Sequence, residues 1–361
     1  MSLTPASGFG QVVSSMPDPA MTRQVDALEQ ALALRFGARQ AIAVSSGTAA
    51  LHAALFALGT GVGDEVLVPA LSVAMSVAPV TYTGATPIFV ECNDAGDDFD
   101  YDDLAAKATP RSKVIMPVHM WGRAGDPGRL RAFADHRAMA IVEDACQAHG
   151  TTVDGRQAGT FGDLGCFSLK DGKILWSGEG GFILTDNAEY AAICRAFRGH
   201  WLTPPVGQLP QSKIGHNYRL AEPLAAIALA NLRRFDELRN LRIRQTTRLL
   251  ADLTGTPGLS PYPTAGGWNG YAPMWRVDLL DPRAFCQRLA TLGVPNSVGT
   301  FGLMSCDLRP GFDRYVSMPC RHTAALIDRT LALVVTERTT DAQLSQYADI
   351  IDTEARRWLN G

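Results

Sequence analysis

Residues 162–185, GDLGCFSLKDGKILWSGEGGFILT, place a lysine in glycine-rich sequence between two apolar runs. Apolar residues predominate at the two ends of this stretch, over 164–169 and 181–185, and Lys173 lies between them. Glycines stand directly before the lysine and again at positions 178, 180 and 181. Short apolar runs separated by glycine-rich sequence are typical of strands joined by a loop. The stretch therefore predicts a strand, a loop that holds Lys173, and a second strand.

A lysine in such a loop has a specific chemical use. Glycines let the backbone approach a ligand closely, and a desolvated lysine has a lowered pKa, which makes its amine a nucleophile toward a carbonyl. We therefore expect Lys173 to form a Schiff base with pyridoxal 5'-phosphate (PLP). The alternative is an exposed loop lysine without a role, and the partner motifs elsewhere in the chain favour the first interpretation.

Length and composition limit the possible classes of protein. The chain has 361 residues, enough for about two domains, and its 46% hydrophobic and 19% charged content fits a globular protein. Its formal net charge of −3 gives no support to nucleic-acid or anionic-membrane binding. No apolar run approaches the ~20 residues of a membrane span, and the N-terminus does not resemble a signal peptide. We expect neither nucleic acid nor membrane as a partner.

Cysteine usage points to a reducing compartment. The seven cysteines are scattered, their number is odd, and no Cys-x-x-Cys occurs. This pattern predicts neither a disulfide framework nor a metal site. A cytoplasmic location is the simplest expectation.

The order of predicted elements indicates an α/β fold. Residues 1–20 are expected to form an N-terminal arm. Expected strands and helices then alternate as far as residue 144, with strands at 41–44, 65–69, 87–90, 114–118 and 139–142, and helices at 21–36, 49–58, 73–82, 101–108 and 128–137. Such alternation predicts a mostly parallel sheet with helices on both faces. We expect a large domain over 21–245 and a smaller α+β domain over 246–361.

A possible phosphate site lies between an expected strand and helix. Ser46, Gly47 and Thr48 stand at this junction, and a helix N-terminus binds anions through its free N–H groups and its dipole. The alternative is an ordinary helix N-cap formed by the serine or threonine.

Three further polar residues follow strands or belong to their ends. Asp144 ends an expected buried strand, and ligands of open α/β sheets collect at the carboxyl ends of strands. Its carboxylate is expected to pair with the pyridine nitrogen of PLP, although it could instead cap the next helix. Gln147 is expected to reach the cofactor's 3-hydroxyl, and Ser168 to donate its hydroxyl to the phosphate.

Five blocks of the sequence, taken together, resemble a known family. Five blocks occur in the family's order, at 46–51, 63–69, 143–150, 161–181 and 217–222. Together they are similar to the DegT/DnrJ/EryC1/StrS family of PLP-dependent aminotransferases, which act on keto-sugars and related cyclitols. The similarity is good over about 20–240 and loose over the last third of the chain.

The resemblance implies the PLP-dependent transferase fold type I and a homodimer with active sites at the subunit interface. It implies that Lys173 is the Schiff-base lysine, that Asp144 is the pyridinium partner and that Gln147 contacts the ring oxygen. Gly47, Thr48 and Ser168 would hold the phosphate, with Ser46 beside them. Asn217 would reach the phosphate of the neighbouring subunit, and the polar, proline-containing segment 202–212 before it could cross the dimer.

Two departures from the family pattern bear on substrate choice. Relatives usually place an aromatic residue where this chain has Val73, stacked on the pyridine ring. This chain has either lost that stack or supplies it from elsewhere. Residues 320–322, Cys-Arg-His, stand where relatives often show a proline-led pattern.

The function expected from these residues is amino-group transfer from glutamate or glutamine to a keto-sugar or keto-cyclitol, in amino-sugar or secondary-metabolite biosynthesis. Lys173 would move the proton between the donor's α-carbon and the cofactor. Two alternatives stay open: dehydration or deoxygenation on the same cofactor, and a non-catalytic PLP-binding regulator. The family's sugar dehydratases replace the lysine with histidine, so Lys173 argues against dehydration. The sequence does not specify the acceptor, whether it is nucleotide-linked, or which of the two donors is used.

Overall fold

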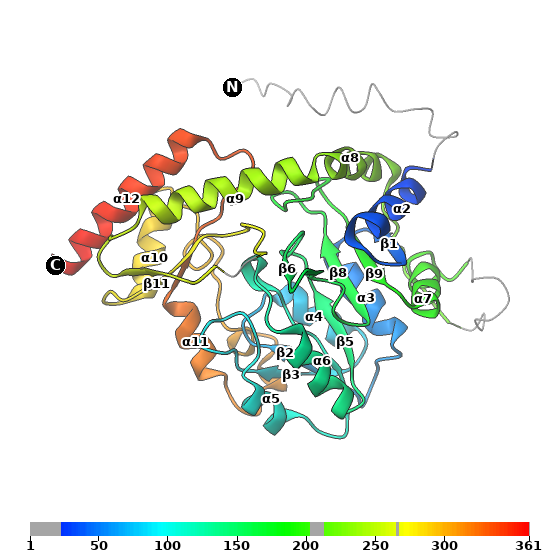
Figure 1. Cartoon of the computed structure of the whole chain (residues 1–361). Coiled ribbons are helices and arrows are strands. Elements are labelled where there is room, and N and C mark those ends of the chain that lie inside the picture. The colour runs from blue at the N-terminus through cyan, green and yellow to red at the C-terminus, as the bar shows by residue number, and fades with distance from the viewer. Residues whose placement is uncertain (1–22, 203–212, 265–266, 361) are drawn as a thin grey trace.

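A seven-stranded sheet forms the centre of the molecule in a computed structural model that describes residues 23–202, 213–264 and 267–360 (Figure 1). The strand order is β1-β9-β8-β5-β4-β2-β3. Only β9 runs antiparallel to its neighbours, β1 and β8, among the strands of this sheet, and the remaining pairs are parallel. The strands are β1 (Gln40–Val44), β2 (Glu65–Pro69), β3 (Thr86–Val90), β4 (Ser112–Ile115), β5 (Ala140–Asp144), β8 (Leu164–Ser168) and β9 (Gly181–Thr185).

Helices cover both faces of this sheet, as the alternating sequence predicts. One face packs against α3 (Gly47–Ala57), α4 (Ala74–Tyr82) and α7 (Ala188–Arg198). The other face packs against α2 (Gln24–Phe36) and α8 (Glu222–Arg233) at one end, and against α5 (Tyr101–Lys107) and α6 (Pro127–His136) at the other. Because both faces are covered, strands β2, β8 and β9 are buried at every position, which is typical of parallel sheets.

Local sequence explains where the helices begin. Asp100, Asp126 and Asn187 each accept hydrogen bonds from the first N–H groups of the helix that follows them. These are the residue types that cap helix N-termini. Helix α2 ends at Gly37, whose φ of 74° is left-handed and costs glycine little.

The C-terminal part has its own small sheet. Strands β10 (Leu259–Pro261), β11 (Met274–Val277) and β12 (Thr330–Ala332) are antiparallel. Helices α9 (Phe235–Asp252), α10 (Pro282–Thr291), α11 (Arg321–Asp328) and α12 (Asp341–Asn360) accompany them, with the 3-10 turns η2 (Cys306–Leu308) and η3 (Asp313–Tyr315). Helix α9 leads from the large sheet to this part, where α12 packs along it (Figure 1).

The core of the C-terminal part continues into the first part of the chain. Trp275, Phe285 and Ile351 pack with Trp121 and Leu71, which precede the expected domain boundary. The boundary at residue 245 falls inside α9, and the division into two domains stays a prediction. The expected arm, residues 1–20, lies outside the described residues.

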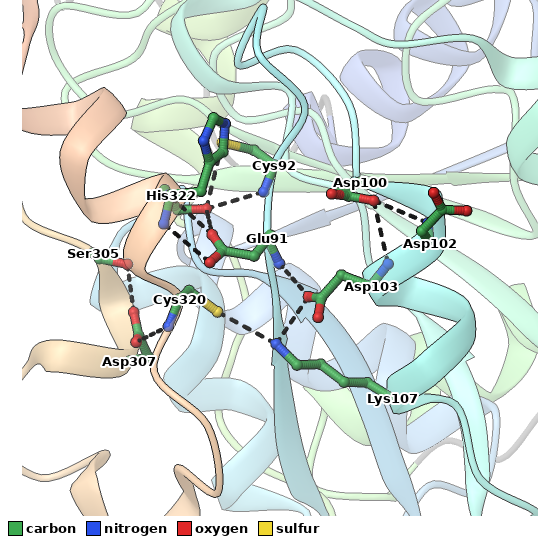
Figure 2. Close-up of polar contacts among 11 residues, drawn as sticks. Glu91, Cys92, Asp100, Asp102, Asp103, Lys107, Ser305, Asp307, Cys320 and His322 are labelled. Carbon is green, nitrogen blue, oxygen red and sulfur yellow. Dashed lines mark hydrogen bonds and ion pairs between the residues drawn. The ribbon is translucent and has the colours of Figure 1, made fainter.

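A polar junction holds α11 against the edge of the large sheet (Figure 2). Glu91, after β3, accepts hydrogen bonds from the N–H groups of His322 and Thr323 at 3.1 and 2.7 Å. Lys107 donates to the Cys320 thiol at 3.6 Å and pairs with Asp103 at 2.8 Å. Residues 320–322, which depart from the family pattern, therefore begin a helix that is tied to the sheet edge.

Two remaining features complete the fold. A hairpin of β6 (Thr152–Val153) and β7 (Arg156–Gln157) follows β5 and was not predicted. Within the described ranges, no helix is both long and apolar enough to cross a bilayer.

Candidate active site

The loop between β8 and β9 carries Lys173, as the sequence predicts. The two strands pair antiparallel, and the ladder continues beyond them, because Leu169 N–H donates to Gly180 O at 2.8 Å. Gly172, directly before the lysine, has a φ of 84°, a conformation that side chains disfavour. The loop thus turns sharply at Gly172 and presents Lys173 at one end of the sheet.

The Lys173 amine is partly buried and has one described hydrogen-bond partner. Its Nζ donates to the Tyr271 hydroxyl at 3.3 Å and lies 5.2 Å from the centre of the Tyr271 ring. Burial by itself lowers the pKa of Lys173, but Tyr271, Cys146 and Asp144 outweigh burial, so the pKa lies above its ordinary value. The expectation of a lowered pKa is therefore wrong for the protein without a cofactor. The cause is that the fold places Tyr271, Cys146 and Asp144 around the amine, where they favour its charged form.

A cavity of about 420 Å³ opens beside Lys173. Its walls come from the start of α4, the turn after β4, the Lys173 loop and several segments of the C-terminal part. Apolar, uncharged polar and charged side chains share this lining, which includes Val73, Met75, Trp121, Gln147, Lys170, Asp171, Lys173, Tyr271, Ser297, Phe301, Leu303, Arg309 and Val335. Two segments that are far apart in sequence, the Lys173 loop and residues 297–309, thus line one cavity.

Asp144 lies at the C-terminal end of β5 and is 4% exposed. Its Oδ2 accepts from Ser76 Oγ at 2.6 Å, and its Oδ1 accepts from Cys146 N–H at 3.1 Å. Residues 145–150 form turns, so Asp144 does not cap a helix. Two hydrogen bonds therefore orient a buried carboxylate whose charge acts on Lys173.

Gln147 lines the same cavity as Lys173. Its Oε1 accepts from Trp121 N–H at 2.8 Å, and its backbone carbonyl accepts from Asn269 Nδ2 at 2.8 Å. Trp121 takes a positive φ of 56°, which is uncommon for a bulky residue. The hydrogen bond to Trp121 fixes the Gln147 amide at the cavity wall.

The residues predicted to hold a phosphate meet at the N-terminus of α3. Ser46 Oγ accepts from Ala49 N–H at 3.0 Å, so the serine is the helix N-cap. Gly47 and Thr48 open the helix, where N–H groups have no intrahelical acceptor. A Cβ placed on Gly47 would lie 2.7 Å from Cys146 Sγ and 3.0 Å from Ser168 Cβ. Only glycine lets this helix end approach the ends of β5 and β8 so closely.

Asn217 is one of six predicted site residues, with Ser46, Gly47, Thr48, Asp144 and Ser168, that do not line the Lys173 cavity. It is exposed and pairs with Gly199, at the end of α7, in an isolated bridge. The neighbouring Tyr218 hydroxyl lies 3.0 Å from His52 Nδ1, which anchors this segment to α3. Residues 203–212, predicted to cross a dimer, lie outside the described residues.

The sequence did not indicate four residues of this site: Ser76, Trp121, Tyr271 and Arg309. Trp121 is 2% exposed, packs in the core of the C-terminal part and also lines the cavity. Trp176, three residues after Lys173 in the sequence, does not line the cavity, and the Arg338 guanidinium lies 5.4 Å from its ring centre. Ser76 lies one helical turn after Val73, at the start of α4, a spacing that could have suggested a shared face. Tyr271 and Arg309 belong to the loosely similar last third and give no local signal.

Comparison with known proteins agrees with this geometry. A model of the DegT/DnrJ/EryC1/StrS aminotransferase family matches residues 18–352. GDP-perosamine synthase of Caulobacter vibrioides is 41% identical over 215 residues, 58% of this chain and 56% of that protein. L-Glutamine:2-deoxy-scyllo-inosose aminotransferase of Streptoalloteichus tenebrarius is 34% identical over 258 residues, 68% of this chain and 61% of that protein. These matches span 56–61% of the relatives' lengths.

The fold is similar along nearly the whole chain to that of solved aminotransferases. The aminotransferase from Psychrobacter cryohalolentis superposes with a TM-score of 0.85 at 25% identity, covering 99% of this chain and 98% of that one. The predicted α/β fold with a mostly parallel central sheet is thereby confirmed.

Proposed function

The chain belongs to the DegT/DnrJ/EryC1/StrS aminotransferase family, and on this basis we propose that it is a PLP-dependent aminotransferase. It takes an amino group from glutamate or glutamine and delivers it to a keto-sugar or keto-cyclitol. The observation that carries this proposal is the shared cavity of Lys173 and Gln147, with the buried Asp144 carboxylate acting on the lysine. The activity belongs to amino-sugar or secondary-metabolite biosynthesis, in the cytoplasm.

The chemical character of the residues present suits PLP. The end of α3 at Gly47 packs so closely that a Cβ there would collide with Cys146 Sγ. The first N–H groups of α3 have no intrahelical acceptor, and they would be the donors for a phosphate. Asp144, buried and held by Ser76, would face a protonated pyridine nitrogen. Gln147 would contact the ring oxygen, and the amine of Lys173 would hold the cofactor covalently.

PLP, when bound, supplies an electron sink for the carbon that loses or gains a proton. The chain's own residues would bind and orient the cofactor and would transfer protons to and from the substrate. Ser76 and the Cys146 N–H hold the Asp144 carboxylate in one orientation. Lys173, once its amine is free, moves the proton from the donor's α-carbon. Tyr271, within 3.3 Å of the amine, limits where that amine can point.

The names of the two relatives support the proposed acceptor class. One is called a GDP-perosamine synthase and the other a 2-deoxy-scyllo-inosose aminotransferase. A screen of keto-sugars, nucleotide-linked keto-sugars and keto-cyclitols, each with glutamate and with glutamine, tests the proposal. We expect an aminated product from at least one acceptor. No product and no keto acid from either donor would contradict an aminotransferase.

The two alternative functions make different predictions in the same assay. A dehydratase on this cofactor would release a dehydrated sugar without consuming an amino donor. A non-catalytic regulator would bind PLP, but its absorbance would not change when glutamate or glutamine is added. The presence of Lys173, where the family's dehydratases carry histidine, favours amino-group transfer.

We further propose a homodimer in which each site takes residues from two chains. The Asn217 side chain is exposed at the surface of its own chain, which supports a role toward a second copy. Asn217→Asp would place a carboxylate against a phosphate, where like charges repel strongly.

Mixing two inactive variants tests this arrangement. The homodimers of Asn217→Asp and Lys173→Ala should each be inactive. In a hybrid dimer with shared sites, one site carries both lesions and the other carries none, so activity should return on mixing and refolding. Confirmed subunit exchange without any return of activity would show that both residues serve one site from the same chain.

A further inference from the structure

Arg309 stands in the wall of the Lys173 cavity with most of its hydrogen-bonding capacity unused. It follows η2, and its Nη2 donates to Gly302 O at a long 3.4 Å. Its Nε is buried and has no acceptor among the described residues. A guanidinium carries five N–H donors in a fixed fork, and a buried donor without an acceptor is costly. The group is therefore arranged to receive an acceptor from outside the chain.

The carboxylates near Arg309 are already engaged. Asp307, two residues earlier, accepts from Cys320 N–H at 2.7 Å and from the Ser305 hydroxyl (Figure 2). Asp171, which lines the same cavity, pairs with both terminal nitrogens of Arg338, at 2.9 and 3.3 Å. Within the described residues, neither carboxylate forms a hydrogen bond or an ion pair with Arg309.

The charges of the cavity favour an anion. Lys170, Lys173 and Arg309 line it, and Asp171 is the one carboxylate in its described lining. Apolar side chains of Phe301, Leu303 and Val335 form the neighbouring walls. Apolar walls lower the local dielectric constant and strengthen a charged hydrogen bond.

We propose that Arg309 binds the anionic group of a substrate in the Lys173 cavity. This inference rests on the proposed function, because it assigns to Arg309 either a carboxylate of the amino donor or a phosphate of a nucleotide-linked acceptor. A carboxylate and a phosphate each present a pair of oxygens that a guanidinium binds with two parallel hydrogen bonds. The site is separate from the phosphate site predicted at Gly47 and Ser168, neither of which lines this cavity.

Calorimetric titration of the purified, PLP-loaded protein with non-reacting probes tests this role without measuring turnover. Glutarate represents the donor's carboxylates, and GDP, UDP and dTDP represent a nucleotide-linked acceptor. Arg309→Gln removes the charge, and Arg314→Gln is the matched control, because Arg314 lies in the same segment, donates to Tyr315 OH at 2.7 Å and does not line the cavity. Arg309→Met, which keeps the apolar stem, decides by the same criterion if the glutamine variant does not fold.

We expect Arg309→Gln to weaken one class of probe roughly 10- to 100-fold, the range for loss of one hydrogen bond to a charged group. Weaker glutarate binding assigns Arg309 to the donor, and weaker nucleotide binding assigns it to the acceptor. The inference is overturned if the unaltered protein binds neither class, or if neither class binds more weakly than in the Arg314→Gln control.

Borohydride fixation of PLP in the same preparations separates this inference from the proposed function. Label on Lys173 with unchanged probe binding removes only the role of Arg309. Absence of label on Lys173 removes the proposed function, whereas a loss of probe binding in Arg309→Gln would still identify an anion site.

Discussion

Tyr271→Phe removes the hydroxyl that lies 3.3 Å from Lys173 Nζ and leaves the ring in place. In the cofactor-free protein this hydroxyl helps to hold the pKa of Lys173 above its ordinary value, against the opposing effect of burial. Without the hydroxyl, the effect of burial is opposed less strongly, so the pKa of Lys173 falls. A larger fraction of Lys173 is then the free amine at a given pH. Lys173 in the variant should therefore react faster with an electrophile at neutral pH.

The geometry sets the size of this effect. A hydrogen bond to a charged group contributes about 1.5–3 kcal/mol, and the 3.3 Å separation is long for such a bond. The lower end of this range, about 1.5 kcal/mol, corresponds to roughly a tenfold change in the free-amine fraction, because each factor of ten is about 1.4 kcal/mol. Asp144 and Cys146 remain in the variant and continue to favour the ammonium form.

Competitive labelling with acetic anhydride, followed by peptide mass spectrometry, measures this fraction for Lys173 between pH 7 and 10. We expect Tyr271→Phe to label about tenfold faster at pH 8, and the two proteins to converge at high pH. Tyr262→Phe is the matched control, because its hydroxyl contacts Thr330 at 3.0 Å and it does not line this cavity. Equal labelling in Tyr271→Phe and the unaltered protein, or slower labelling in the variant, would refute this account of the Lys173 environment.

Three other predictions follow from the same site. Asp144→Ala should slow transamination by about 10²–10³-fold, as for loss of a group that stabilises charge in a transition state, and near-normal turnover would exclude that role. Val73→Phe should tighten PLP about 2- to 10-fold, since aromatic contacts contribute roughly 0.5–1.5 kcal/mol beyond burial; unchanged affinity in a fluorescence titration would indicate that Trp121 or Tyr271 already supplies the stack. Burial, with a contribution from Lys173, lowers the pKa of His149 to about 3. The unfolded chain therefore binds a proton near pH 6.5 that the folded chain binds only near pH 3, and stability falls as pH drops through this window. The free energy of unfolding should therefore fall by about 2 kcal/mol less between pH 7 and 5 in His149→Leu than in the unaltered protein. The same pH dependence of urea unfolding in both proteins would contradict this prediction.

The sequence predicted the parts of the site that depend on local patterns. Glycines and apolar runs around Lys173 predicted the strand–loop–strand unit, because turn residues and burial act over a few positions. Asp144 was expected at the end of a strand, and the strand ends there. Ser46 was given two possible roles, and the N-cap is observed; its contribution to a phosphate site stays a prediction.

The parts of the site that depend on contacts between distant residues could not be predicted from local sequence patterns. Tyr271 follows Lys173 by 98 positions, and packing of the C-terminal part brings its hydroxyl to the amine. The direction of the Lys173 pKa was predicted wrongly for the same reason, since it depends on Tyr271, Cys146 and Asp144 together. Arg309 has no sequence neighbour that suggests a ligand, and only the cavity relates it to Lys173.

Borohydride reduction of the PLP-loaded protein, followed by peptide mass spectrometry, tests the central assignment most directly. Reduction makes the bond between the cofactor and a lysine permanent, and the labelled peptide identifies that lysine. The cavity offers two lysines, Lys170 and Lys173, so the measurement discriminates within one loop. We predict the label on Lys173, and its disappearance in Lys173→Ala. Label on Lys170, or none on this loop, would contradict the assignment.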